Sequence, residues 1–161
     1  MKTSRISLIT DETAADALPM RFTVAAILIA IIGLLVASSV LDMMSTARTH
    51  EAQTEISKIV SNAEQMSVRG AGSVITLDID IPNDVTVVLG ALPENRGEWP
   101  RDAGNYYIHS GSGRRVYEAD AAFSNLEVDD AVELSPGPHR LTLESVYNSD
   151  HGKLFVLVYE R

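Results

Sequence analysis

The chain changes its hydrophobic pattern twice, and these changes divide it into three predicted parts. Residues 22–41 carry no charge and consist mostly of Ile, Leu, Val and Ala. Between residues 52 and 66 apolar side chains recur every three or four positions, and from Ser73 they alternate with polar ones. These periods predict an apolar helix, an amphipathic helix and then strands. We therefore expect an α+β protein: a long N-terminal transmembrane and stalk helix followed by a small antiparallel β-sandwich.

Residues 22–41 are predicted to be a transmembrane helix. Twenty residues at 1.5 Å each span about 30 Å, the thickness of a bilayer's hydrocarbon core. Arg21 and Asp42 bracket the segment, and residues 1–21 are expected to be a flexible cytoplasmic tail. A cleaved signal peptide, with small residues at Val36-Ala37-Ser38, is the alternative. The apolar run is longer than such a signal usually has, which favours a retained anchor.

Residues 42–69 are predicted to continue the helix as an amphipathic stalk that ends at Gly70. The stalk carries one narrow apolar stripe, named here the stalk stripe: Ala52, Ile56, Ile59, Ala63 and Met66. Two interpretations stay open. The stripe packs on the chain's own β-domain, or it also forms an assembly surface with neighbouring copies, for which its two alanines suit close helix approach.

Residues 70–161 are predicted to form the β-sandwich domain. Seven strands are expected, at Val74–Ile81, Val85–Gly90, Asn105–His109, Arg114–Asp120, Ala131–Leu134, Arg140–Tyr147 and Lys153–Tyr159. Hairpin loops are expected at 110–113 and 148–152, and Pro136-Gly137-Pro138 reads as a tight turn. The last strand is apolar on both faces, which is typical of a central strand. The fragment 72–161 is expected to fold alone.

Charge and cysteine content exclude several classes of function. Residues 70–161 carry seven Lys or Arg and fifteen Asp or Glu. Because this acidic domain repels phosphate backbones, we expect no nucleic-acid partner. The chain has no cysteine, which excludes disulfides, thiolate metal sites and cysteine nucleophiles.

Candidate catalytic and metal-binding residues lack the spacing that such sites need. Four histidines fall on separate elements and are expected to be solvated: His50, His109, His139 and His151. Asp78 and Asp80 share one strand face and Asp129-Asp130 lies in a loop, but the twelve-residue calcium loop is missing. The nucleophile motif G-x-S-x-G is also missing. We expect no enzyme, catalytic residue, cofactor, metal or small-molecule substrate.

Trp99 is the only tryptophan and lies in the long loop between the second and third predicted strands. A lone loop tryptophan most often folds back on the core. The alternative is a contact residue for a partner, in which case the loop 93–105 would form the binding region.

The layout resembles type IV pilins and, more narrowly, archaeal pilin-like and archaellin-like proteins. The resemblance covers the whole chain and is mostly architectural. Its most specific pieces are Asp11-Glu12-Thr13-Ala14 before Pro19-Met20-Arg21, and the segment 134–141 (LSPGPHRL) before a late strand. Pilins often have a Glu early in the apolar helix, and 22–41 has none. The resemblance therefore implies an accessory or minor subunit that stays in the membrane.

Two functions from different classes follow. The first is a non-enzymatic, structural or accessory subunit of a type IV pilus-like or archaellum-like surface assembly, with membrane lipid around 22–41 and other pilin-like subunits as partners. The second is a monomeric, membrane-tethered β-sandwich that binds a partner through its loops. Both place the protein in the cell membrane as a single-pass protein with an extracellular β-domain.

Overall fold

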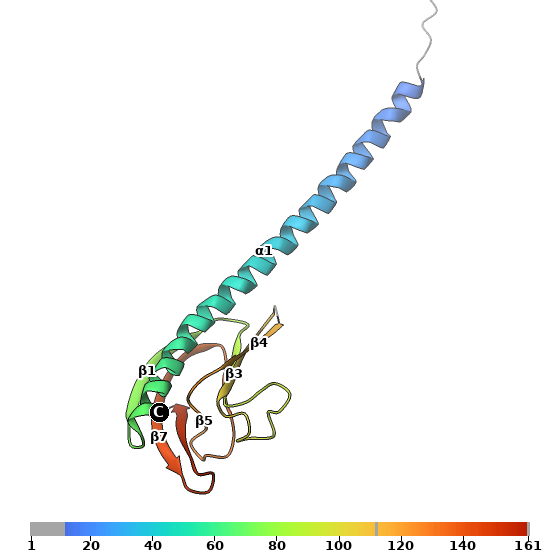
Figure 1. The fold of residues 1–161 in the computed structure, drawn as a ribbon. Helices are drawn as coiled ribbons and strands as arrows, with labels where there is room; N and C mark the ends of the chain where they lie inside the picture. Colours follow the sequence, from blue (N-terminus) through green and yellow to red (C-terminus); the bar gives the residue numbers. More distant parts are fainter. Residues whose placement is uncertain (1–11, 112, 161) are drawn as a thin grey trace, which may run out of the picture. The chain divides into compact units, whose positions relative to one another are not determined.

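The computed structural model describes residues 12–111 and 113–160, with side chains from Met20 onward (Figure 1). The chain divides into two compact units, Met1–Leu41 and Asp42–Arg161. Each unit is described by itself below. The second unit contains both sheets and the C-terminal part of the only helix among the described residues.

One helix, α1 (Glu12–Arg69), runs through the predicted anchor and the predicted stalk without a break. It begins ten residues before the predicted anchor, so the second half of the predicted flexible tail is helical. Three alanines within 14–17 agree with the early start, since Ala has the highest helix propensity. The predicted end is confirmed, because Gly70 takes a φ of 92° and its N–H bonds to the Met66 carbonyl.

Eight strands form two four-stranded sheets, with orders β1-β7-β8-β5 and β4-β3-β2-β6. The strands are β1 (Val74–Ile81), β2 (Thr86–Leu89), β3 (Asn105–Ser110), β4 (Gly113–Glu118), β5 (Phe123–Ser124), β6 (Val132–Leu134), β7 (Gly137–Asn148) and β8 (Lys153–Glu160). All seven predicted strands are present, and β1 has its predicted bounds. Both predicted hairpins join neighbouring antiparallel strands, β3 with β4 and β7 with β8.

The structure corrects the strand prediction in two places. The short strand β5 was not predicted, and it pairs parallel with β8, so the first sheet is not wholly antiparallel. Gly137 and Pro138 do not form a turn, because they are the first residues of β7 and pair with Ile81 and Asp80 of β1. A proline is tolerated there because β8 begins to pair only at Leu141, so the start of β7 has a single neighbour.

One hydrophobic core contains residues of both sheets and of the C-terminal part of α1. It joins Ile79 of β1, Val87 of β2, Leu141 of β7 and Val156 of β8 with the buried face of the helix. Smaller clusters cover the opposite faces, around Phe155 in the first sheet and Tyr107 in the second. In Figure 1 the C-terminal end of α1 runs past β1 and β7.

Strand β8 is central in its sheet and apolar on both faces, as predicted. Val156 and Val158 belong to the main core, whereas Phe155 and Leu157 belong to the cluster on the opposite face. A strand that is buried on both sides loses the alternation that marks a half-exposed strand.

Candidate functional site

The stalk stripe belongs to the core of its own chain. Four of its five residues are fully buried and Met66 is 2% exposed. The sheets place Ile79, Leu141 and Leu143 in the same core cluster. This burial within the chain is the arrangement of the first interpretation, and it leaves at most 2% of each stripe residue exposed. A period of three to four residues shows that one helix face is covered, but it does not show what covers it.

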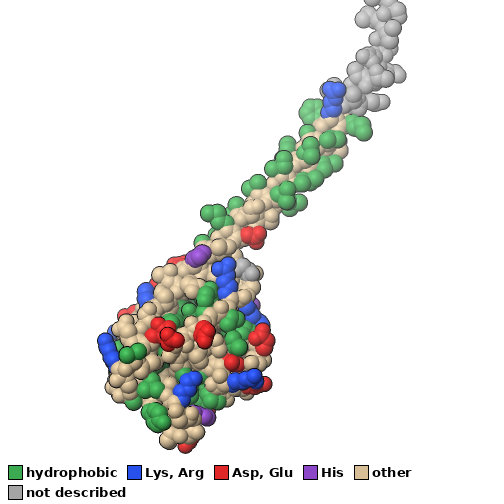
Figure 2. All heavy atoms as spheres, viewed as in Figure 1, with side chains coloured by type: hydrophobic (Ala, Val, Ile, Leu, Met, Phe, Trp, Pro, Cys, Tyr) green, Lys and Arg blue, Asp and Glu red, His purple; other side chains and the backbone are tan. Residues whose placement is uncertain are grey.

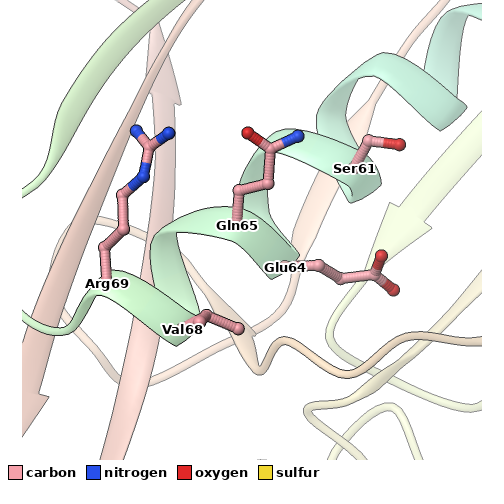
Figure 3. Close-up of a pocket in the computed structure, with 5 residues that line it drawn as sticks. All are labelled: Ser61, Glu64, Gln65, Val68 and Arg69. Carbon is pink, nitrogen blue, oxygen red and sulfur yellow. The ribbon is translucent and has the colours of Figure 1, made fainter.

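The solvent-facing side of the stalk is polar. Figure 3 shows five of its side chains, which line an open depression of about 400 Å³: Ser61, Glu64, Gln65, Val68 and Arg69. Glu64 accepts a hydrogen bond of 3.3 Å from the backbone N–H of Asp120. Val68 is 89% exposed and is the one apolar side chain of the five. A lone exposed valine among polar groups is ordinary surface and does not indicate a docking site.

The apolar part of α1 presents its hydrophobic side chains outward. Phe22, Ile29 and Leu34 are each at least 70% exposed. Figure 2 shows hydrophobic side chains along this part of the helix. Among the described residues this is the one helix long and apolar enough to cross a membrane. A helix that is apolar on all sides needs a partner other than water, either lipid or protein.

Trp99 folds back onto the cluster that covers the outer face of the first sheet. Its ring lies 5.2 Å from the ring of Phe155 and 5.3 Å from that of His151. Its indole N–H donates a hydrogen bond of 3.3 Å to the Phe123 carbonyl. The side chain therefore packs as a plug and has its polar group satisfied, as expected of a lone loop tryptophan.

Trp99 also lines an open polar cavity of about 570 Å³, together with Arg96, Asn125, Asp129 and Asp130. The polar groups of this cavity are largely engaged with one another. The Asn125 side chain accepts from the backbone N–H groups of Asp129 and Asp130 and donates to the Asp129 carboxylate at 2.6 Å. Arg96 forms an ion pair with Glu133, which raises the pKa of the guanidinium above its usual value against a smaller effect of burial.

His139 differs from the expected solvated surface histidine. Its side chain is only 9% exposed, whereas His50, His109 and His151 are exposed as predicted. Its Nδ1 lies 2.5 Å from Glu160 Oε1 and its Nε2 lies 2.6 Å from the Ser135 carbonyl. Both neighbours offer acceptor oxygens, an arrangement that favours the imidazolium, in which both ring nitrogens donate.

The sequence contains a signal for this burial. His139 has the same strand parity as Leu141 and Leu143, both of which face the core. Burial by itself lowers the pKa of His139, but the hydrogen bonds to Glu160 and Ser135 and the charges of Glu160 and Asp80 raise the pKa above its ordinary value overall.

The raised pKa of His139 predicts a pH-dependent contribution to stability. A group whose pKa is higher in the folded state binds its proton more tightly there. Its stabilisation is fully present below the unfolded pKa of about 6.5 and is lost as the pH rises through the folded value. We expect the free energy of unfolding lost on His139→Gln to be largest in mildly acidic buffer and to shrink toward alkaline pH. Denaturant unfolding of both proteins across this range measures the difference, and a pH-independent difference would contradict the assignment.

The described residues contain no group of three or more His, Cys, Asp or Glu placed to hold a metal ion. Asp78 and Asp80 are exposed on β1, and Asp78 lies 3.5 Å from Arg140 across the sheet in an exposed ion pair. Comparison of the chain with protein-family models, with curated proteins and with solved structures finds no match. The candidate functional surfaces are therefore the apolar part of α1 and the cavity beside Trp99.

Proposed function

We propose that the protein is a non-enzymatic, membrane-anchored structural subunit, of the accessory type, in a pilus-like or archaellum-like surface assembly. One observation supports this most. The apolar stretch of α1 and the helix face that completes the β-domain core belong to one uninterrupted helix, Glu12–Arg69. The same helix therefore supplies both the apolar surface for membrane or subunit contacts and a structural part of the β-domain.

Contacts between subunits are proposed to lie within the apolar segment, since the stalk stripe is buried. Gly33 has open space beside it, because apart from its chain neighbours and the helix's own backbone no atom lies within 4 Å of the position that a Cβ would take. Ala37 follows one turn later on the same helix face. Small residues at this spacing allow two helices to approach closely in lipid, where van der Waals contact replaces the hydrophobic effect.

The orientation proposed is tail inside and β-sandwich outside. Lys2, Arg5 and Arg21 precede the apolar segment, and Arg48 and Lys58 follow it. Positive charge on the cytoplasmic side favours this direction by a small margin. The resemblance to pilins is the stronger argument, because their β-domains face outward.

A second function is supported by a separate observation. The cavity of about 570 Å³ beside Trp99 is open and lined with polar groups. A monomeric, membrane-tethered binding module would use it to hold a partner outside the cell. Association of subunits within the membrane distinguishes the two functions, since the structural subunit requires it and the monomeric binding module does not.

Cross-linking of single cysteines in native membranes tests the structural function. The chain has no cysteine of its own, so Gly33→Cys places one thiol on the proposed helix face. Leu35→Cys is the matched control, because two residues turn the helix by about 200° at nearly the same depth. We expect oxidation to give disulfide-linked adducts several-fold more with the first variant than with the second.

Absence of adducts from both variants would favour the monomeric binding module. Equal adducts from both would indicate random collisions in the bilayer. Protease added to the same intact cells reads the orientation, since an outward domain is digested before lysis and an inward one only after it.

A further inference from the structure

Two turns of the β-domain meet α1 just after the apolar segment ends. The hydroxyls of Thr49 and Ser110 are 3.1 Å apart and share a buried hydrogen bond, which ties the β3–β4 hairpin to the helix. Arg48 pairs with Asp84 at 2.7 Å, which ties the β1–β2 turn to the same helical turn. These contacts define an anchor-side end of the unit Asp42–Arg161, while the β7–β8 hairpin lies at the opposite end of the sheet.

The chain connection limits the distance between the anchor-side end and the last residue of the apolar segment. Ser45, whose hydroxyl lies near Gly111 of the β3–β4 turn, follows Leu41 by four residues. Four residues of chain span at most about 15 Å, and about 6 Å when helical. If 22–41 spans a bilayer, the β3–β4 hairpin reaches the headgroup layer. This step rests on the proposed membrane insertion and not on the proposed assembly.

Charge is distributed unevenly between this end and the rest of the unit. The segments 42–50, 82–86 and 109–115 together carry three arginines and two aspartates. The remainder of 42–161 carries seven Lys or Arg and seventeen Asp or Glu. A domain this acidic is repelled by an anionic membrane surface, whereas its anchor-side end is not.

Two of the acids near this end have cationic partners. Asp84 is paired with Arg48, and Glu160 is paired with His139, whose pKa is raised and which Asp80 also faces. Pairing removes much of the repulsion that these carboxylates would exert on lipid phosphates. The excess positive charge at this end is therefore left to the β3–β4 hairpin.

Arg114 and Arg115 supply that charge. Both are exposed on β4, an edge strand whose residues are open to solvent along most of its length. Neither has an acidic partner among the residues that the structure describes. Their cross-strand neighbours are His109 and Ile108, which also offer no carboxylate. The two residues are consecutive on the strand and therefore lie on opposite faces of the sheet. Each exposed guanidinium suits a separate phosphate, whose oxygens accept planar, paired hydrogen bonds.

We propose that the β3–β4 hairpin binds the phosphate groups of anionic lipids through Arg114 and Arg115. The contact holds the β-domain against the membrane surface and fixes its orientation, in addition to the covalent link through α1. The Thr49–Ser110 hydrogen bond orders the hairpin on the helix, so the two arginines keep their position relative to the helix residues around Thr49.

The test uses the full chain in vesicles of phosphatidylcholine alone and of phosphatidylcholine mixed with phosphatidylglycerol. A single fluorescent label is placed through Val116→Cys on β4 or through Ser149→Cys on the opposite hairpin, and nitroxide-headgroup lipids serve as the quencher. We expect anionic lipid to raise quenching at position 116 about twofold and to leave position 149 unchanged. Arg114→Gln with Arg115→Gln should abolish the increase. Arg101→Gln with Lys153→Gln, which removes the same charge elsewhere, should preserve it.

Equal quenching at position 116 in the two lipid mixtures, or an increase that survives the Arg114→Gln and Arg115→Gln changes, would overturn the hairpin contact. Vesicle flotation of the labelled chain is measured first. A chain that does not float overturns membrane insertion and the hairpin contact together. A chain that floats but shows no lipid-dependent quenching overturns the contact alone.

Discussion

A chain that begins at Gly72 is expected not to fold, whereas one that begins at Asp42 is expected to fold and to unfold cooperatively. The sequence alone favours the opposite for 72–161, because the strands have an apolar face of their own. In the structure that face is closed by α1. Ile56, Ile59 and Met66 are at most 2% exposed and lie in the same cluster as Leu141 and Val156.

This expectation depends on how much free energy of folding the buried helix residues contribute. Each buried Ile or Met contributes about 1.5–3 kcal/mol, so these three residues contribute roughly 5–9 kcal/mol. That is comparable with the whole stability of a small domain, about 5–15 kcal/mol. Removing the helix also exposes the sheet residues that it covers. Circular dichroism with thermal melting compares the two fragments, and a cooperative transition of 72–161 in neutral buffer would show that the sheets form a sufficient core without the helix.

Local periodicity was enough to predict the elements that it determines. In β1 the polar residues Thr76, Asp78 and Asp80 alternate with Leu77 and Ile79, and the strand has its predicted bounds. The position of β8 in the middle of its sheet followed from an apolar run with no alternation. In both cases the side chains themselves carry the information. The polar and apolar residues of β1 alternate because one face of the strand is more exposed than the other, and β8 lacks alternation because both of its faces are buried.

Periodicity failed where backbone pairing or a distant neighbour determines the structure. Strand β5 forms because backbone hydrogen bonds hold this segment in place. The Val156 N–H donates to the Ala122 carbonyl, and the Phe123 N–H donates to the Ala103 carbonyl. The two residues of β5, Phe123 and Ser124, are too few to show a period. Gly137 and Pro138 have turn composition, yet they pair with β1. His139 was expected to be solvated because histidine is usually exposed, although its strand parity places it toward the core.

The stalk stripe shows a different limit of prediction from the sequence pattern. Apolar residues at a spacing of three to four predict a covered helix face equally well for an internal core and for a coiled-coil seam. The choice depends on whether the rest of the chain leaves an apolar surface uncovered. Both sheets leave such a surface, and α1 covers it with residues from Ala52 to Met66. Only the three-dimensional arrangement contains that information.

The changes Ile56→Asp and Ile59→Asp, made together, are therefore expected to unfold the β-domain and not merely to separate subunits. Each substitution removes a buried side chain and places a carboxylate in a core with no cationic partner among the described residues of its cluster. Loss of the apolar contact costs about 2–5 kcal/mol at each position, and an unpaired buried charge adds several more. The total exceeds the stability of most small domains.

Ser57→Asp with Ser61→Asp is the matched control, because it adds the same charge on the solvent-facing side of the same helical turns. We expect this control to shift the melting temperature by only a few degrees. Circular dichroism and limited proteolysis of the full chain in detergent read the folded state, and cross-linking in native membranes reads association. A double Ile variant that keeps a folded β-domain while losing its cross-links would return the stripe to the assembly surface. If the double Ile variant loses its folded domain and the double Ser control keeps it, the stripe belongs to the core. Assembly contacts are then expected in the apolar segment, because the accessible face of the stalk, from Glu51 to Arg69, has mainly polar side chains.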